Sequence, residues 1–424
     1  MRDFFIDRFR YIRRDAIAGI ITGLMAIPLS VGICLMSKFP ILIGLYTVIF
    51  ACCIGFIFYL IRPGNYVGTP GIAAGLAPAL ALGVDSFGMA NMPFLVFATA
   101  CLQAVVWKFN LQRYILKFVP HFLVEGLLAG VGLKIALNFL PYVYTTSNPS
   151  HGIFHLDRII VVILSILSLS AFLYLYNKYG KTLPGLSYSS ILLFGTISMF
   201  FISLPTIEVE QIDFKFEFPM PHGEYFKDKS LAYEVVLMIG YAVVLGSIDV
   251  IEQVMSNAAI EKLDPLNRRC DTNNSLLAIW VANLGSSFFG GMTNLDGLAK
   301  SSTNAFAGAY TKLSNLFTAA VISVMVIFPH LLSYLPEYTL GVIMIFTGWK
   351  MISGLGNVAR AYGKYELSLA IVCGLLVFRL GIFEGLLIAL AVNILIGFVY
   401  HKSRNREISE IWSHIIFHTD EEIG

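Results

Sequence analysis

Long runs of apolar residues, separated by short polar stretches, dominate the chain. A run of about 18 or more apolar residues is long enough to cross a hydrocarbon core of about 30 Å as a helix. We expect fourteen apolar segments. They cover 15–36, 41–61, 70–84, 91–107, 119–140, 158–176, 184–204, 231–256, 274–290, 297–309, 314–334, 338–356, 364–380 and 382–401. The segments at 70–84 and 297–309 are too short to span as ordinary helices.

Composition and charge agree with this pattern. The chain is 57% hydrophobic and 13% charged, with a mean hydropathy of +0.75, whereas soluble domains hold about 25% charged residues. Most of its Lys and Arg residues fall in loops on the side of Met1. The positive-inside rule then predicts two cytoplasmic termini and an even number of spans. We expect an all-α polytopic protein of the plasma (inner) membrane.

The N-terminal residues and the cysteines add little to the prediction of function. Residues 1–14 mix arginines with Phe, Ile and Tyr, which predicts a basic amphipathic segment on the inner membrane surface. An ordinary charged start that orients the first span is the alternative. No cleavable signal peptide is expected, because the first span is of full length. The six cysteines lack metal-ligand spacing, so we expect no disulfide and no metal cofactor.

An acidic residue, Asp249, lies inside the apolar segment 231–256. A charge at bilayer depth costs a few kcal/mol on insertion scales, so it normally faces a polar cavity or a partner. A second carboxylate, Asp296, and a lysine, Lys300, stand at the head of the short segment 297–309. Together the three residues predict a polar site near the membrane midplane, which indicates transport.

The chain also divides into two similar halves. The polar stretch 205–230 leaves seven segments on each side, and an odd number per half is typical of an inverted repeat. In each half the third segment is short and follows Gly- and Pro-rich chain, at 63–71 and 290–297. We therefore expect a 7+7 inverted repeat with two half-helices, segments 3 and 10.

Such half-helices would form an anion site by themselves. A helix that begins inside the membrane leaves its first four N–H groups without intrahelical partners and carries about half a positive charge at that end. Two facing ends can bind an anion without a charged side chain. Irregular backbone at this depth must be buried in protein or line a wet cavity. The alternative is that these stretches are extramembrane loops beside short interfacial helices.

Several stretches resemble the sulfate permease (SulP) family. Residues 15–47, from Asp15 to Thr47, look like its first two helices, and Gly246-Ser-Ile-Asp249 looks like its eighth helix, which carries Glu or Asp at this point. Residues 289–316 look like its ninth to eleventh helices and are the most specific piece. Leu331-Leu-Ser-Tyr-Leu-Pro336 also fits. The resemblance covers roughly 11–400.

The resemblance implies a core domain that moves against a gate domain like an elevator. The core would hold 15–118 and 231–335. The gate would hold 119–230, including the outer loop, and 336–402. Substrate would bind between the starts of segments 3 and 10. The family usually carries a cytoplasmic STAS domain, for which the tail 403–424 is too short, so the resemblance is to the membrane domain without it.

The resemblance also implies a substrate class and a set of site residues. Family substrates include sulfate, bicarbonate, chloride and dicarboxylates, and some members are coupled to protons or sodium. Aspartate at 249 is similar to the cyanobacterial sodium-bicarbonate permeases, where this residue helps to bind sodium. The implied substrate-binding residues are Thr69, Gly71, Ile72, Asp296, Gly297, Leu298 and Lys300. The implied coupling-ion residues are Asp249, which would bind Na⁺, Gln253 and Asp296. Tyr46 and Phe306 would close over the substrate.

Two departures from the family pattern keep other functions open. Gln253 stands where sodium-coupled relatives have a hydroxyl, and Asp296 replaces a small residue and would repel an anion at short range. Asp296 could instead pair with Lys300 at i, i+4, be protonated, or bind the coupling cation. Uracil and xanthine permeases share this fold type and carry carboxylates on helices 8 and 10. A same-fold transporter of a nucleobase, zwitterion or cation is therefore one alternative, and an uncoupled anion channel is another.

An enzyme is not expected. The sequence has no HExxH motif, no Walker-type loop and no nucleophile elbow. The expected partners are a small inorganic anion and membrane lipid, with a homodimer left open and no nucleic acid. Our prediction is a secondary active transporter of a bicarbonate- or sulfate-class anion, coupled to Na⁺ or H⁺.

Overall fold

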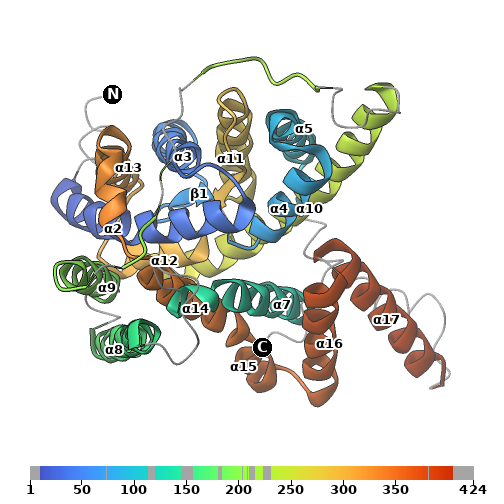
Figure 1. Cartoon of the computed structure of the whole chain (residues 1–424). Coiled ribbons are helices and arrows are strands. Elements are labelled where there is room, and N and C mark those ends of the chain that lie inside the picture. The colour runs from blue at the N-terminus through green and yellow to red at the C-terminus, as the bar shows by residue number, and fades with distance from the viewer. Residues whose placement is uncertain are drawn as a thin grey trace. The chain divides into compact units, whose positions relative to one another are not determined.

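The computed structural model is mostly helical (Figure 1). It describes residues 10–72, 74–112, 120–144, 156–179, 184–202, 204–207, 209, 215–222, 231–380 and 382–403. The described α-helices are α2 (Ile12–Ser37), α3 (Ile41–Ile61), α4 (Ala77–Phe87), α5 (Met92–Lys108), α7 (His121–Phe139), α8 (Leu156–Tyr179), α9 (Pro184–Met199), α10 (Leu231–Leu263), α11 (Thr272–Ser287), α12 (Leu298–Phe306), α13 (Ser314–Ile327), α14 (Glu337–Ile352), α15 (Gly354–Ala361), α16 (Lys364–Leu380) and α17 (Ile382–Ser403). Short 3₁₀ turns are η1 (Met89–Asn91), η2 (Pro141–Val143) and η3 (Pro329–Tyr334), and the strands are β1 (Pro70–Ile72) and β2 (Asn294–Asp296).

The helices follow the apolar runs of the sequence. Within the described ranges, seven helices are long and apolar enough to cross a membrane. The segment predicted at 41–61 is confirmed by α3, and several other helices begin or end a few residues away from the prediction. Most of the amphipathic segment 1–14 and nearly all of the tail 403–424 lie outside the described residues, so those two predictions have no structural counterpart here.

The chain forms two compact units. The first holds Met1–Trp107 and Phe139–Met344, and the second holds Lys108–Asn138 and Ile345–Gly424. Helices α8 and α9 belong to the first unit, and the boundary between the units falls within α14. The division into core and gate domains remains a prediction.

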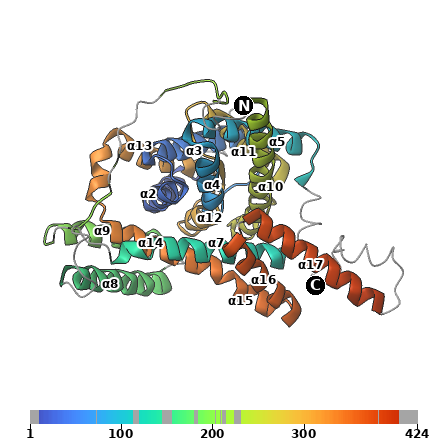
Figure 2. The ribbon, with the colours of Figure 1, turned by 45° about the vertical axis from the view of Figure 1, so that its right-hand side comes forward.

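Close helix packing in the first unit depends on small residues. Helix α2 packs against α13, α4 and α12 (Figure 2). A Cβ added at Gly23 would lie 2.7 Å from the Cβ of Val321 on α13, and one at Gly19 would collide with the carbonyl of Ser314. The Thr318 hydroxyl donates to the Gly19 carbonyl at 3.0 Å. This is the small-xxx-small packing by which membrane helices approach each other without a hydrophobic driving force.

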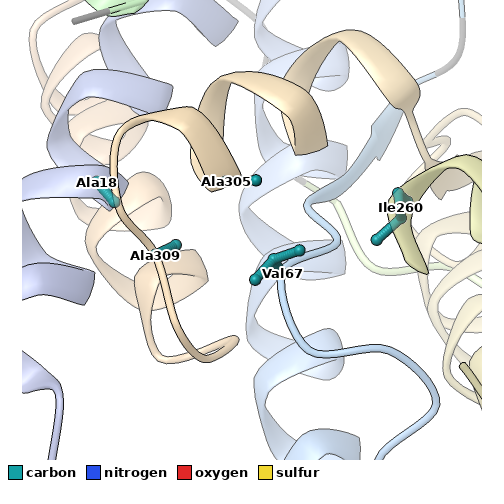
Figure 3. Packing of buried hydrophobic residues seen from close by; sticks show 5 residues of the cluster. All are labelled: Ala18, Val67, Ile260, Ala305 and Ala309. Carbon is teal, nitrogen blue, oxygen red and sulfur yellow. The ribbon is translucent and has the colours of Figure 1, made fainter. Parts of the chain in front are cut away.

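A compact apolar cluster sits where distant parts of the first unit meet. Figure 3 shows side chains from α2, the chain before β1, the end of α10, and α12 with the turn after it. The cluster consists of Ala18, Val67, Ile260, Ala305 and Ala309, all buried. Because three of the five are alanines, the backbones of these elements can lie close together. The cluster thereby holds the chain before β1 against α12.

The second unit is also built on glycine contacts. A Cβ at Gly130 of α7 would collide with the Gly374 carbonyl of α16, and one at Gly126 would collide with the Ala370 carbonyl. Gly132 of α7 and Gly348 of α14 each approach the other's carbonyl just as closely. Helix α16 packs in turn against α15 and α17.

The two short segments of the sequence prediction differ in detail from the structure. Helix α4 begins at Ala77 rather than at 70, because residues 70–72 form strand β1. Helix α12 begins at Leu298, directly after β2, and ends at Phe306. Buried N–H and C=O groups need partners, and the two strands supply some to each other.

Candidate functional site

The site is built on the two-stranded ladder of β1 and β2. The strands run antiparallel, and Pro70 pairs with Asp296, Gly71 with Leu295 and Ile72 with Asn294. All six residues are buried. The ladder joins the chain before α4 to the chain before α12, so that sequence-predicted residues from both halves, Thr69 to Ile72 and Asp296 to Lys300, lie together.

Lys300 crosses from α12 to the first strand. Its side chain is buried, with 2% exposed, and its Nζ donates to the Ile72 carbonyl at 3.0 Å. A Cβ at Gly71 would collide with this Nζ. The φ of Gly71 is +152°, a backbone conformation that L side chains rarely adopt. This conformation favours glycine at 71, and a methyl group there would force the Lys300 ammonium to move.

Asp296 is paired with Lys312 rather than with Lys300. The Lys312 Nζ lies 3.2 Å from each carboxylate oxygen of Asp296, and both side chains are buried. The Asp296 Oδ2 also accepts from the Asn65 amide at 2.6 Å and from the Ser275 hydroxyl at 3.1 Å. A buried ion pair is tolerated when such additional hydrogen bonds satisfy its remaining lone pairs. The negative charge that would repel an anion is thus balanced within the protein.

Gln253 belongs to the Asp296 network. Its Oε1 accepts from the Asp296 N–H at 2.7 Å, and its Nε2 donates to the Ser275 hydroxyl at 2.9 Å and to the Asp296 Oδ2 at 3.3 Å. Both ends of the amide are therefore engaged away from Asp249, although the resemblance had placed Gln253 beside it at a coupling-ion site.

Asp249 has its own polar network on α10. The residue is fully buried, and its Oδ2 accepts from the Gln103 amide of α5 at 2.8 Å and from the Asn283 amide of α11 at 3.4 Å. Asn283 also accepts from the Asn294 N–H of β2 at 2.6 Å. The second oxygen of Asp249, Oδ1, has no hydrogen-bond partner within the described part of the chain. Because buried polar atoms are normally paired, this oxygen is a candidate ligand atom.

Two further buried oxygens near this network are unpaired. They are the Thr293 Oγ1 and the Asn294 Oδ1, for which the described residues supply no donor. Both residues are fully buried at the start of β2, and the Asn294 main chain is bonded to Asn283. Carboxylate, hydroxyl and amide oxygens are each ligand types that suit a hard cation.

The other predicted contacts are distributed around the ladder. The Thr69 N–H donates to the Ser301 hydroxyl at 3.0 Å, while its own buried Oγ1 finds no partner among the described residues. Gly297 caps the start of α12 without a side-chain bond, and Leu298 is 45% exposed. Tyr46 is partly buried on α3, and Phe306 ends α12 with 40% of its side chain exposed. Closure of these two aromatics over a substrate stays a prediction.

Sequence reasoning missed six polar residues that complete the two networks. These are Asn65, Gln103, Asn257, Ser275, Asn283 and Lys312. Gln103 and Asn283 carry a usable signal, because an amide inside an apolar helix needs a polar neighbour. Lys312 carries none, since the sequence places it in a loop between two apolar segments, where a lysine is ordinary.

Comparison with known proteins agrees with the resemblance in the sequence. The model of the sulfate permease family matches residues 12–375. The putative sulfate transporter YvdB of Bacillus subtilis (strain 168) is 25% identical over 422 residues, which cover 94% of this chain and 75% of that protein. The bicarbonate transporter BicA of Picosynechococcus sp. is 22% identical over 337 residues, which cover 75% of this chain and 58% of that protein.

Two solved structures are similar in fold. The transmembrane domain of a cyanobacterial bicarbonate transporter BicA gives a TM-score of 0.69 at 18% identity, covering 90% of this chain and 97% of that one. The structure of SLC26A9 gives a TM-score of 0.72 at 17% identity, covering 92% of this chain and 66% of that one. Because the family match spans most of the length, the chain belongs to the sulfate permease family, whose members are transmembrane anion transporters and not enzymes.

Proposed function

We propose that this chain is a secondary active transporter of a small inorganic anion of the bicarbonate or sulfate class, driven by Na⁺ or H⁺. The observation that carries the proposal is the position of Lys300, whose buried ammonium reaches across the β1–β2 ladder to the Ile72 carbonyl. The names of the relatives, a putative sulfate transporter and a bicarbonate transporter, support this class of substrate.

The anion binds at the ladder, between the starts of α4 and α12. These helix ends carry partial positive charge, and Lys300 adds a full one. The unpaired Thr69 hydroxyl is a donor that a bound oxyanion would satisfy. Asp296 does not oppose binding, because Lys312 balances its charge. Gly71, Ile72, Gly297 and Leu298 shape the backbone around the anion.

The coupling ion binds at Asp249. Its unpaired Oδ1, with the unpaired oxygens of Thr293 and Asn294, supplies acceptors for Na⁺ or for a proton. Asn283 is hydrogen-bonded both to Asp249 and to the Asn294 N–H of β2. Binding of a cation at Asp249 can therefore change the position of β2 in the ladder. Gln253 and Asp296 are committed to each other and to Lys312, and we leave them out of the ion site.

The architecture that we propose is the family's fourteen-segment inverted repeat. Segments 3 and 10 are the half-helices α4 and α12, and the core carries the site past the gate as an elevator. Both termini lie in the cytoplasm and the protein resides in the plasma (inner) membrane. A homodimer is compatible with this scheme and is not required by it.

The alternatives differ in what Asp249 and Asp296 do. A nucleobase, zwitterion or cation transporter would need the Asp296 carboxylate for its substrate, and the Lys312 pair makes that less favourable. An uncoupled anion channel would need no coupling acid, so Asp249 would be dispensable for accumulation.

Uptake into proteoliposomes tests the proposal. The wild-type protein is compared with Asp249→Asn, Lys300→Met and, as a control for removing a lysine, Lys262→Met at an exposed position. Labelled bicarbonate and labelled sulfate are each supplied with and without an inward Na⁺ or H⁺ gradient at constant ionic strength. We expect one anion to accumulate above equilibrium in wild type and in Lys262→Met.

Each variant has a distinct expected defect. Asp249→Asn should lose accumulation and retain at most equilibration, whereas Lys300→Met should lose uptake altogether. Full concentrative uptake by Asp249→Asn would rule out its coupling role, and wild-type uptake by Lys300→Met would rule out the anion site. Equilibration without accumulation in wild type itself would identify a channel.

A further inference from the structure

A third carboxylate lies beside the site without a role so far. Glu252 is on α10, three residues after Asp249, and its side chain is partly buried. None of the residues that the structure describes forms a hydrogen bond with its carboxylate. An unneutralised acid next to a proposed anion site calls for a physical account, because it would repel the substrate.

The carboxylate of Glu252 packs directly on the chain that leads into α4. A Cβ built on Gly75 would lie 2.5 Å from its Oε2, 2.8 Å from its Oε1 and 2.9 Å from its carboxyl carbon. A side chain at position 75 would displace the Glu252 carboxylate. The start of α4 follows at Ala77, so the positive end of the helix dipole favours a negative charge there.

Lys300 approaches the same place from α12. Its ammonium contacts the Ile72 carbonyl, and the Glu252 carboxylate packs on Gly75, three residues further along the same stretch of chain. The remaining charges nearby are balanced by other groups: Asp296 is paired with Lys312, and Asp249 carries the coupling cation of the proposed function. Glu252 and Lys300 therefore set the charge balance at the start of α4.

We propose that Glu252 is a counter-charge to Lys300 that makes the site selective for singly charged anions over divalent ones. This inference rests on the proposed anion site. With Glu252 charged, Lys300 and Glu252 sum to zero, so a monoanion leaves one net negative charge in the site and a dianion leaves two. The cost of a buried net charge rises steeply with its magnitude, so the dianion is disfavoured.

Neutralising Glu252 should change the two affinities unequally. The Coulomb repulsion between Glu252 and a dianion is twice that for a monoanion at the same distance. Its removal should therefore strengthen dianion binding by the square of the factor found for the monoanion. We expect the affinity to rise about tenfold for the monoanion and therefore about a hundredfold for the dianion. A factor of ten in affinity corresponds to about 1.4 kcal/mol.

The experiment measures binding of nitrate and sulfate to the detergent-purified full chain at one pH. Nitrate is a planar monoanion, sulfate is a dianion, and neither changes its charge near neutral pH. Dissociation constants come from ligand-dependent thermal stabilisation of wild type, Glu252→Gln, Glu252→Asp and Lys300→Met. Glu366→Gln, which removes a partly buried glutamate of the second unit, is the matched control.

The expected result is a shift in preference in Glu252→Gln alone. In Glu252→Gln the affinity for sulfate should rise about tenfold more than the affinity for nitrate. Glu252→Asp, which keeps the charge, and Glu366→Gln should keep the wild-type ratio of the two dissociation constants. An unchanged ratio in Glu252→Gln would overturn the inference, and so would equal gains for both anions, which would indicate a steric effect. If Glu252→Gln does not fold, Glu252→Ala removes the same charge: a shift of the ratio towards sulfate supports the inference, and a wild-type ratio overturns it.

Failure of the proposed function would look different. If Lys300→Met binds nitrate and sulfate as wild type does, the anion site itself is misplaced and both proposals fall. If nitrate, sulfate and bicarbonate all fail to stabilise the wild-type chain, both proposals fall as well. If Lys300→Met loses binding while Glu252→Gln keeps the wild-type ratio, only the role of Glu252 is wrong.

Discussion

The Lys312 ammonium lies 3.2 Å from each carboxylate oxygen of Asp296, and both side chains are buried. This pair changes the meaning of an acidic residue at the head of α12. Taken alone, Asp296 argues against an anion substrate, because a fixed negative charge would stand beside the helix end. Paired with Lys312, it becomes part of the frame that holds β2 to the start of α13.

Loss of Lys312 should therefore destabilise the protein strongly. Lys312→Met leaves the Asp296 carboxylate buried and unpaired, which costs about 3–5 kcal/mol. The double variant Asp296→Asn, Lys312→Met should recover much of this loss, because no buried charge remains. Thermal unfolding in detergent measures the effect, with exposed Lys262→Met as the control. Equal melting temperatures for Lys312→Met and Lys262→Met would show that the buried pair does not contribute.

Gly71→Ala should damage the site through the position of Lys300. The new methyl group would collide with the Lys300 Nζ, and the φ of +152° is strained for any L side chain, at about 1–3 kcal/mol. We expect anion uptake to fall at least tenfold. Gly240→Ala is the control, because nothing lies within 4 Å of a Cβ at that position. Uptake by Gly71→Ala at the level of Gly240→Ala would contradict the close approach of Lys300 to β1.

Gln103 should tune the cation dependence of transport. Its amide donates to the Asp249 Oδ2 at 2.8 Å, and a hydrogen bond to a charged group contributes about 1.5–3 kcal/mol. Gln103→Ala should therefore shift the Na⁺ or H⁺ concentration for half-maximal uptake by about tenfold or more. Uptake over a series of cation concentrations measures this shift. Anion binding in the absence of a gradient serves as the control and should change little; an unchanged cation dependence would separate Gln103 from the coupling site.

Much of the helical framework follows from local sequence. Helix α3 matches its predicted bounds because an unbroken apolar run lies between Pro40 and Arg62. The burial of Asp249 with polar partners follows from the cost of an isolated charge at bilayer depth, and Gln103 and Asn283 provide those partners. Local composition and simple electrostatics suffice for such features.

The parts that could not be predicted depend on contacts between the two halves. Three-residue strands show no periodicity, so the pairing of Ile72 with Asn294 has no local signal, and the start of α4 was placed too early. Lys312 returns to Asp296 only because the chain turns sharply after α12, where Gly308 has a φ of +95°. An i, i+4 rule on α12 points instead to Lys300, and it cannot detect a competing partner beyond the helix.

The Cys270 thiol, between α10 and α11, should react unusually slowly with alkylating reagents. Burial, together with the nearby Glu261 carboxylate, raises its pKa from an ordinary value of about 9 to about 12. The Cys270 N–H also donates to the Glu261 Oε2 at 2.8 Å, which fixes the two residues together. Only the thiolate attacks a maleimide, so a raised pKa lowers the reactive fraction at pH 7.5.

The raised pKa of Cys270 also determines how its alkylation rate changes with pH. The alkylation rate of Cys270 should rise about tenfold per pH unit through pH 9 and beyond, whereas an exposed thiol levels off near its own pKa. A reference thiol is Lys262→Cys in a Cys270→Ala background, at an exposed position on α10. Glu261→Gln should accelerate Cys270 several-fold, because it removes the carboxylate charge. Equal rates for Cys270 and the reference thiol at pH 7.5 would mean that Cys270 is not held in this buried, acidic setting.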